Sequence, residues 1–163
     1  MKNTPPDGVI RLKVKKDTIL RDPGCQITTY EYSPVVEVKG VPWKASASLA
    51  NNCKIDSAIE CCLRKSSDWN IDMDVGFILV NSDTSKNITV EDSYNFRFIN
   101  PPYNPPVSKL KNCSKLIIDN SLIEPENGFI NDLTFVIEIR FWITKMKGIR
   151  IPELTDFTYP NDP

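Results

Sequence analysis

Histidine is absent from this chain of 163 residues. Its absence removes the side chain best suited to proton transfer near neutral pH. It also excludes Ser-His-Asp and Cys-His activation of a nucleophile, and zinc sites whose ligands include histidine. The sequence contains neither a phosphate-binding glycine loop nor a nucleophile motif. We therefore expect a protein that is not an enzyme and that has no catalytic residue, no metal site and no cofactor.

An excess of charge of either sign is also missing, since 20 basic and 21 acidic residues give a net charge of −1. Binding to nucleic acid needs a concentrated basic surface, so a nucleic-acid partner is not expected. No apolar run approaches the length that spans a membrane, and the N-terminal MKNTPPDG is polar. The expected location is the cytoplasm or the nucleus, with no membrane partner.

Cysteine is present but in a pattern that does not suit disulfides. The five cysteines are an odd number, and none of them forms a C-x-x-C motif. Cys61 and Cys62 are adjacent, so in a strand they would face opposite sides of the sheet. We expect reduced thiols that are partly buried.

The dominant positive signal is alternation of apolar and polar side chains, which is the period of a half-buried strand. It runs through VIRLKV (9–14), WKASASL (43–49), YNFRF (94–98) and the stretch from Leu133 to Ile143. GFILV (76–80) is a continuous apolar run, which is typical of a strand covered on both faces near the middle of a sheet. A further, less regular strand is expected over 55–63.

Helix signals are scarce. Only DNSLIEPEN (119–127) predicts a turn or two of helix, with Asp119 or Asn120 as N-cap and Pro125 at its end. SSDWN (66–70) and the proline-rich NPPYNPP (100–106) are expected to be loops. Many short strands with almost no helix indicate an all-β protein, either an antiparallel sandwich or a barrel.

At this point the sequence resembles a MATH (meprin and TRAF homology, or TRAF-like) domain, and more narrowly those of nematode MATH-BTB proteins. The residues that carry the resemblance are GVIRLKV (8–14), SPVVEVKGVPWK (33–44), FILVN (77–81) and EPENGFINDLTFVIEI (124–139). The resemblance implies an eight-stranded antiparallel β-sandwich with at most one short helix. It divides the chain into an N-terminal arm (1–7), the sandwich (8–145) and a C-terminal linker or tail (146–163).

The resemblance also implies a function. MATH domains bind proteins or extended peptides, and in MATH-BTB proteins they hold the substrate of a cullin ubiquitin ligase. A BTB-mediated dimer and a cullin partner are expected only if the natural chain continues past Pro163. Two alternatives stay open: an interaction or self-assembly scaffold unrelated to ubiquitination, which binds through another surface, and a C2-like calcium or membrane module suggested by Asp68, Asp72 and Asp74.

The family's peptide groove can be carried over by spacing, and most of its aromatic positions are replaced here. Lys109, Lys111 and Lys115 would make this edge basic and would favour an acidic or phosphorylated ligand. For Tyr94 and Phe96, core packing is the competing interpretation. Trp142 could be an exposed interface anchor or could lie under the C-terminal tail. The expected partner-binding residues are Ala58, Val75, Tyr94, Phe96, Lys109, Lys111 and Cys113.

Overall fold

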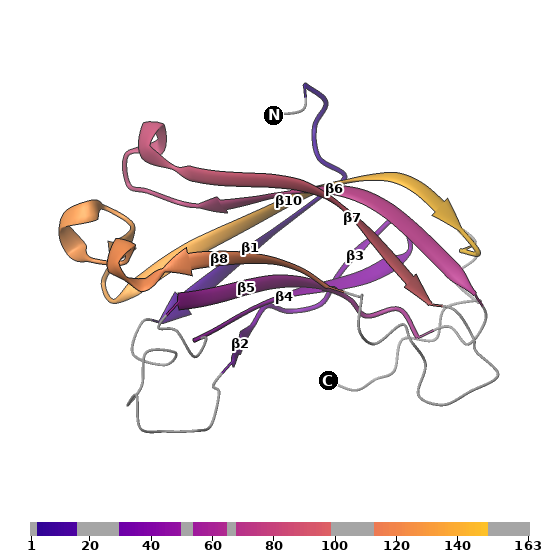
Figure 1. The fold of residues 1–163 in the computed structure, drawn as a ribbon, viewed down its shortest axis with the longest axis horizontal. Coiled ribbons are helices and arrows are strands. Elements are labelled where there is room, and N and C mark those ends of the chain that lie inside the picture. The colour runs from indigo at the N-terminus through magenta and orange to yellow at the C-terminus, as the bar shows by residue number, and fades with distance from the viewer. Residues whose placement is uncertain (1–2, 16–29, 50–53, 65–67, 99–112, 150–163) are drawn as a thin grey trace.

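The chain folds into two antiparallel β-sheets that pack face to face (Figure 1). The computed structural model describes residues 3–15, 30–49, 54–64, 68–98 and 113–149. Sheet A has the strand order β1-β10-β6-β7, with β9 beside β10, and sheet B has the order β2-β4-β5-β8, with β3 beside β4. The strands of sheet A are β1 (Gly8–Lys15), β6 (Trp69–Leu79), β7 (Ile88–Phe98), β9 (Ile130–Asn131) and β10 (Thr134–Lys147). Those of sheet B are β2 (Tyr30–Tyr32), β3 (Val36–Val38), β4 (Val41–Leu49), β5 (Lys54–Cys61) and β8 (Cys113–Asp119).

The expected all-β architecture of two antiparallel sheets is confirmed. The described residues contain ten strands, where the resemblance implies eight, and three of the ten (β2, β3 and β9) have only two or three residues. The only helical elements described are the 3-10 turns η1 (Thr84–Lys86), η3 (Asn120–Leu122) and η4 (Pro125–Asn127). The described residues include no apolar helix long enough to cross a membrane.

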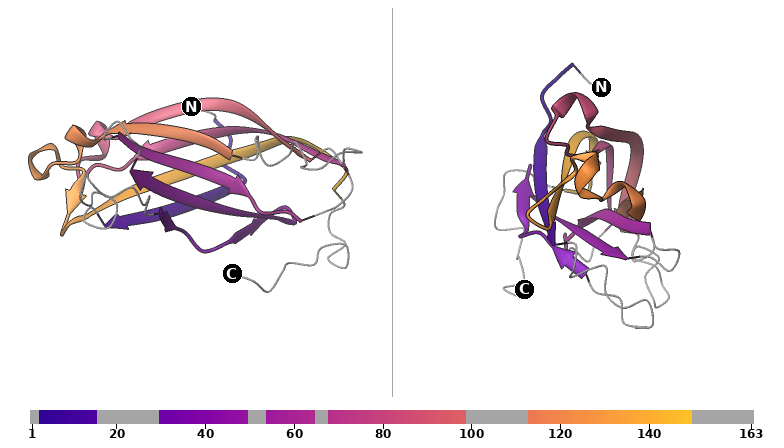
Figure 2. Two further views of the ribbon diagram at one scale, coloured as in Figure 1. Left: turned by 60° about the horizontal axis from the view of Figure 1, so that its bottom comes forward. Right: turned by 90° about the vertical axis from the view of Figure 1, so that its left-hand side faces the viewer.

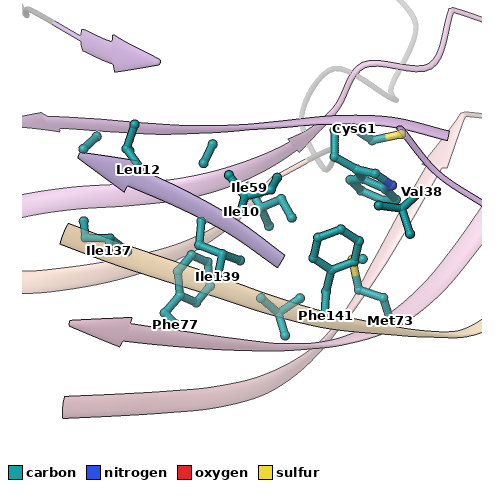
Figure 3. Close-up of a cluster of buried hydrophobic side chains, with 14 of the residues drawn as sticks. Ile10, Leu12, Val38, Ile59, Cys61, Met73, Phe77, Ile137, Ile139 and Phe141 are labelled. Atoms are coloured by element: carbon teal, nitrogen blue, oxygen red, sulfur yellow. The ribbon is translucent and has the colours of Figure 1, made fainter. Parts of the chain in front are cut away.

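The alternation read from the sequence corresponds to burial in the sandwich. In β1, every second residue from Gly8 to Val14 is buried and the residues between them are exposed. β6 lies between β10 and β7, and both Phe77 and Ile78 are buried, as expected for a central strand covered on both faces. Figure 3 shows side chains of the two sheets meeting in one core, to which sheet A contributes Phe141 and sheet B contributes Ile59.

Three local expectations are corrected. Trp69 begins β6 and is buried in the core, so it does not lie in a loop. Leu133 has φ 63° and is 62% exposed, so the last strand begins one residue later, at Thr134. Pro125 does not end a helix but opens the 3-10 turn η4, since proline is well tolerated at the first position of a helical turn.

One end of the sandwich is closed by the turns between β8 and β9. Ile123 and Phe129 are both buried and belong to the core cluster. Between them, Gly128 ends the second turn in the left-handed region with φ 83°, which favours glycine. This is the Asn-Gly turn that the sequence places before the last strand. The residues on both sides of this turn contribute to the core.

Buried Asn81 ties these turns to the loop between β6 and β7. Its Nδ2 donates to the carbonyl oxygen of Asn127 at 2.8 Å, and its Oδ1 accepts from the backbone N–H of Asp83 at 2.9 Å. Its own backbone N–H donates to Oδ1 of Asn87 at 2.7 Å. The two loops at this end are therefore joined through one side chain.

Candidate partner-binding edge

On each side of the sandwich, the edge strand of sheet A lies close to a strand of sheet B. β1 lies close to β4 on one side, and β7 lies close to β8 on the other. Each of β1, β7 and β8 is hydrogen-bonded to one neighbouring strand among the described residues. Figure 2 shows the same arrangement from two further directions. The edges leave backbone groups available for pairing with another strand.

The edge at β7 differs from the rest of the sandwich because its inner face is only partly covered. β7 pairs with β6 over its whole length, from Leu79 opposite Ile88 to Trp69 opposite Phe98. Phe96 is fully buried, and Tyr94 is half-buried against the core. Farther toward the start of the strand, Asp92 is exposed, although side chains two residues apart share one face. Sheet B therefore covers only the second half of β7.

Ile88 and Val90 lie on this uncovered half. Both point to the same face as Phe96, yet they are 36% and 42% exposed. Their partners on β6, Leu79 and Phe77, are buried, so the exposure is confined to the edge strand. An open strand edge beside two exposed branched side chains can pair with an extended chain and take up its apolar side chains.

The residues expected from spacing do not gather on this surface. Val75 and Phe96 point into the core, where the ring of Phe96 meets Trp43 edge-on with centroids 5.2 Å apart. For Phe96 this supports the core interpretation over the binding one. Ala58 lies opposite Ser46, on the face of sheet B that points away from the core, so it cannot line one surface with Val75. The residues expected from spacing are therefore divided between the core and the outer face of sheet B, whereas a groove needs side chains on one face.

Of the remaining expected residues, the structure describes Cys113 alone. Cys113 begins β8 and lies opposite Glu60 in the ladder, as Lys115 lies opposite Ala58. Lys109 and Lys111 lie outside the described residues, as does the proline-rich stretch 100–106. The basic edge expected from these lysines therefore stays a prediction.

Sequence reasoning missed Ile88 and Val90. The signal was present, because the alternation of YNFRF continues upstream through ITVEDS, with Ile88 and Val90 in phase with Tyr94 and Phe96. The pattern alone predicts a strand only from residue 94, because Asp92 interrupts the apolar series. A charged residue in that phase is compatible with a strand only where the facing layer ends.

Trp142 is covered, and the covering segment comes from the N-terminus. Its Nε1 donates to the carbonyl oxygen of Thr4 at 2.9 Å, and its side chain is buried. Asp7 anchors the same arm, accepting from the backbone N–H of Ile143 at 2.7 Å and pairing with Lys39 at 3.2 Å. Residues 3–7 are thus attached to the sandwich, and Trp142 does not act as an exposed anchor in this arrangement.

The acidic residues that suggested a calcium site are engaged across β6 and β7. Asp74 accepts from Oγ of Ser93 at 2.6 Å, and Asp72 accepts from Nδ2 of Asn95 at 2.6 Å. No group of three or more Asp, Glu, Cys or His residues that could hold a metal ion occurs within the described residues.

Two cysteines, Cys61 and Cys62, are described with their side chains, and both are free thiols. Burial raises the pKa of the Cys61 thiol to about 12, so this thiol is protonated at neutral pH. A protonated, buried thiol is a poor nucleophile.

No protein-family model matches the chain, and no curated protein matches it.

Proposed function

We propose that the chain is a MATH-type β-sandwich that binds a protein partner through the β7–β8 edge and has no catalytic activity. The observation that carries the proposal is the exposed apolar pair Ile88 and Val90 on the uncovered inner half of an edge strand. The residues that resemble MATH domains fall largely on strands of this sandwich, which is compatible with the proposed class.

The physical basis is strand addition. An extended segment of the partner gains main-chain hydrogen bonds along an open edge, and its alternate side chains supply specificity. Ile88 and Val90 would contact two of those side chains, because residues two apart lie roughly 6.6 Å from each other along a strand. The preferred ligand is therefore an extended segment with apolar residues at alternate positions.

The finer proposal concerns the role of the partner. By resemblance to MATH-BTB proteins, the bound protein is a substrate that a cullin ligase ubiquitinates through a BTB domain outside this chain. If this is correct, the captured protein should live longer in cells when cullin activity is blocked. An unchanged lifetime would leave the binding role intact but would remove the ubiquitin link.

The binding edge is tested with a double variant, Ile88→Lys together with Val90→Lys. The matched control, Val9→Lys together with Leu133→Lys, changes two other exposed apolar residues, which are 44% and 62% exposed. Proteins captured from an extract of the native cells would be identified by mass spectrometry. Segments of them would then be titrated against the purified domain by calorimetry.

We expect the control to bind as the wild type does and the edge variant to lose the partner, because two buried ammonium groups would replace apolar contacts at the interface. Circular dichroism would verify that both variants are folded. A partner held equally by the edge variant would show that another surface binds it.

Self-assembly is the second candidate, since sheet A has an open edge at β1 as well as at β7 within the described residues. Light scattering of the purified chain over a range of concentrations distinguishes the two. A dimer that the edge variant abolishes would favour self-assembly over capture of a different protein.

A further inference from the structure

The outer face of β1 carries basic side chains at a strict two-residue period. Arg11, Lys13 and Lys15 are all exposed, while Ile10, Leu12 and Val14 between and beside them are buried. Because the chain as a whole has a net charge of −1, this basic row is a local feature and does not reflect the composition.

The neighbouring strand leaves two of these charges without a counter-ion. Lys13 lies opposite Val136 and Lys15 lies opposite Thr134 on β10, and neither of these partners is charged. Neither lysine forms an ion pair with another described residue. No described residue therefore competes with a ligand for these two ammonium groups.

Arg11 is held in place and keeps donors to spare. Its Nη1 donates to Oε1 of Glu138 at 2.6 Å, while Oε2 of the same carboxylate accepts from Nε of Arg140 at 2.6 Å. Two guanidinium groups thus share one carboxylate, so the group keeps a net positive charge. The Arg11 side chain is 53% exposed, and a guanidinium has five N–H donors, so it can bind a second carboxylate.

β1 is also an edge strand. All eight of its residues pair with β10, from Gly8 opposite Phe141 to Lys15 opposite Thr134, and no other strand of the described chain pairs with it. A strand added there would place every second side chain on the outer face, directly beside Arg11, Lys13 and Lys15.

We propose that the β1 edge binds an extended acidic segment of a protein, with carboxylates at alternate positions opposite Arg11, Lys13 and Lys15. Charge complementarity selects this occupant, since a neutral strand would pair no charge and a basic one would be repelled. This site lies on the opposite side of the sandwich from Ile88 and Val90, and the proposal does not depend on that edge.

The test uses a fluorescent eight-residue peptide that alternates glutamate and threonine, titrated against the full chain by fluorescence anisotropy at low and at physiological ionic strength. Lys13→Glu with Lys15→Glu should weaken binding by roughly tenfold, the effect of reversing two charges in register with the ligand. The control, Lys145→Glu with Lys147→Glu, makes the same charge change at the far end of β10 and should bind like the wild type. Equal loss in both variants would overturn the proposal in favour of general charge attraction.

Two further peptides keep the test independent of variant folding. A peptide with lysine in place of glutamate should not bind the wild type. A glutamate peptide with alternate amides N-methylated should bind much more weakly, because it cannot pair with the edge. If the methylated peptide binds as well as the parent, or if the parent does not bind, the proposal is wrong and the basic row only prevents copies from pairing edge to edge.

Discussion

A methyl group added at Gly8 tests how closely the two sheets approach. A Cβ at Gly8 would lie 2.3 Å from Cζ and 2.8 Å from Cε2 of Phe141, and 2.8 Å from Cγ2 of Val38 in the facing sheet. Phe141 is fully buried, and its ring centroid lies 5.5 Å from that of Trp43, so the ring has little space to move. Overpacking of this kind costs about 1–3 kcal/mol, so we expect Gly8→Ala to lower the free energy of unfolding by that amount.

Gly76→Ala is the matched control in the same sheet. A Cβ there would lie 3.7 Å from Cγ of Glu91 and 4.0 Å from Cζ3 of Trp142, which are ordinary contact distances. Because glycine within a strand is less favourable than alanine, this variant should be unchanged or more stable by about 0.5–1 kcal/mol. Urea unfolding followed by circular dichroism measures both. Equal stability of the two variants would refute the packing argument, and a melting temperature lowered by roughly 2–4 °C per kcal/mol would accompany the expected loss.

The remaining predictions concern single side chains. Because burial raises the Cys61 pKa from 9.0 to about 12, only the unfolded thiol ionises between these values. The free energy of unfolding should therefore fall as pH rises through this window, by up to about 1.4 kcal/mol per pH unit from this group. In chemical denaturation at several pH values, Cys61→Ala should show a shallower fall than the wild type. Equal dependence of the unfolding free energy on pH in the two proteins would contradict this. Glu138→Gln removes the carboxylate shared by two arginines and should lower the free energy of unfolding by about 1–2 kcal/mol at low salt and by less at high salt. A loss of stability that does not depend on salt would argue against an ionic effect. Asn81→Ala should lower the free energy of unfolding by about 2 kcal/mol and speed hydrogen exchange in the loop that follows it. Unchanged exchange would show that the loop is held by other contacts. Trp142→Phe removes the hydrogen bond to Thr4 and should lower the free energy of unfolding by about 1 kcal/mol. It should also make the N-terminal arm easier to cleave by protease. An arm cleaved at the wild-type rate would contradict its attachment through this bond.

Local pattern was enough to predict most of the strands. The alternation in β1 and β4 assigns Ile10, Leu12 and Trp43 to the core, and the structure confirms all three. The continuous apolar run at 76–80 predicts a central strand, and β6 confirms it as far as Leu79, because a strand covered on both faces can remain apolar at every position. These predictions succeed because they depend on the two-residue period alone.

The candidate site could not be predicted in the same way. Spacing assigns Ala58 and Val75 to one groove, but Val75 of sheet A points into the core and Ala58 lies on the face of sheet B that points away from the core. The exposure of Ile88 and Val90 depends on where sheet B stops. Asp92 in the same phase is compatible with an uncovered part of β7, but it does not show which residues lie across the core. A surface formed where two layers end is a property of their packing.

The sequence by itself determined that this is an all-β chain of alternating strands, because backbone geometry sends successive side chains to opposite faces. Only the tertiary structure decided which of the apolar side chains stay in contact with solvent. It buried Trp69 at the start of a strand and covered Trp142 with the N-terminal arm, while leaving Ile88 and Val90 open at an edge. Burial depends on what lies across the core, and those contacts join residues that are far apart in the chain.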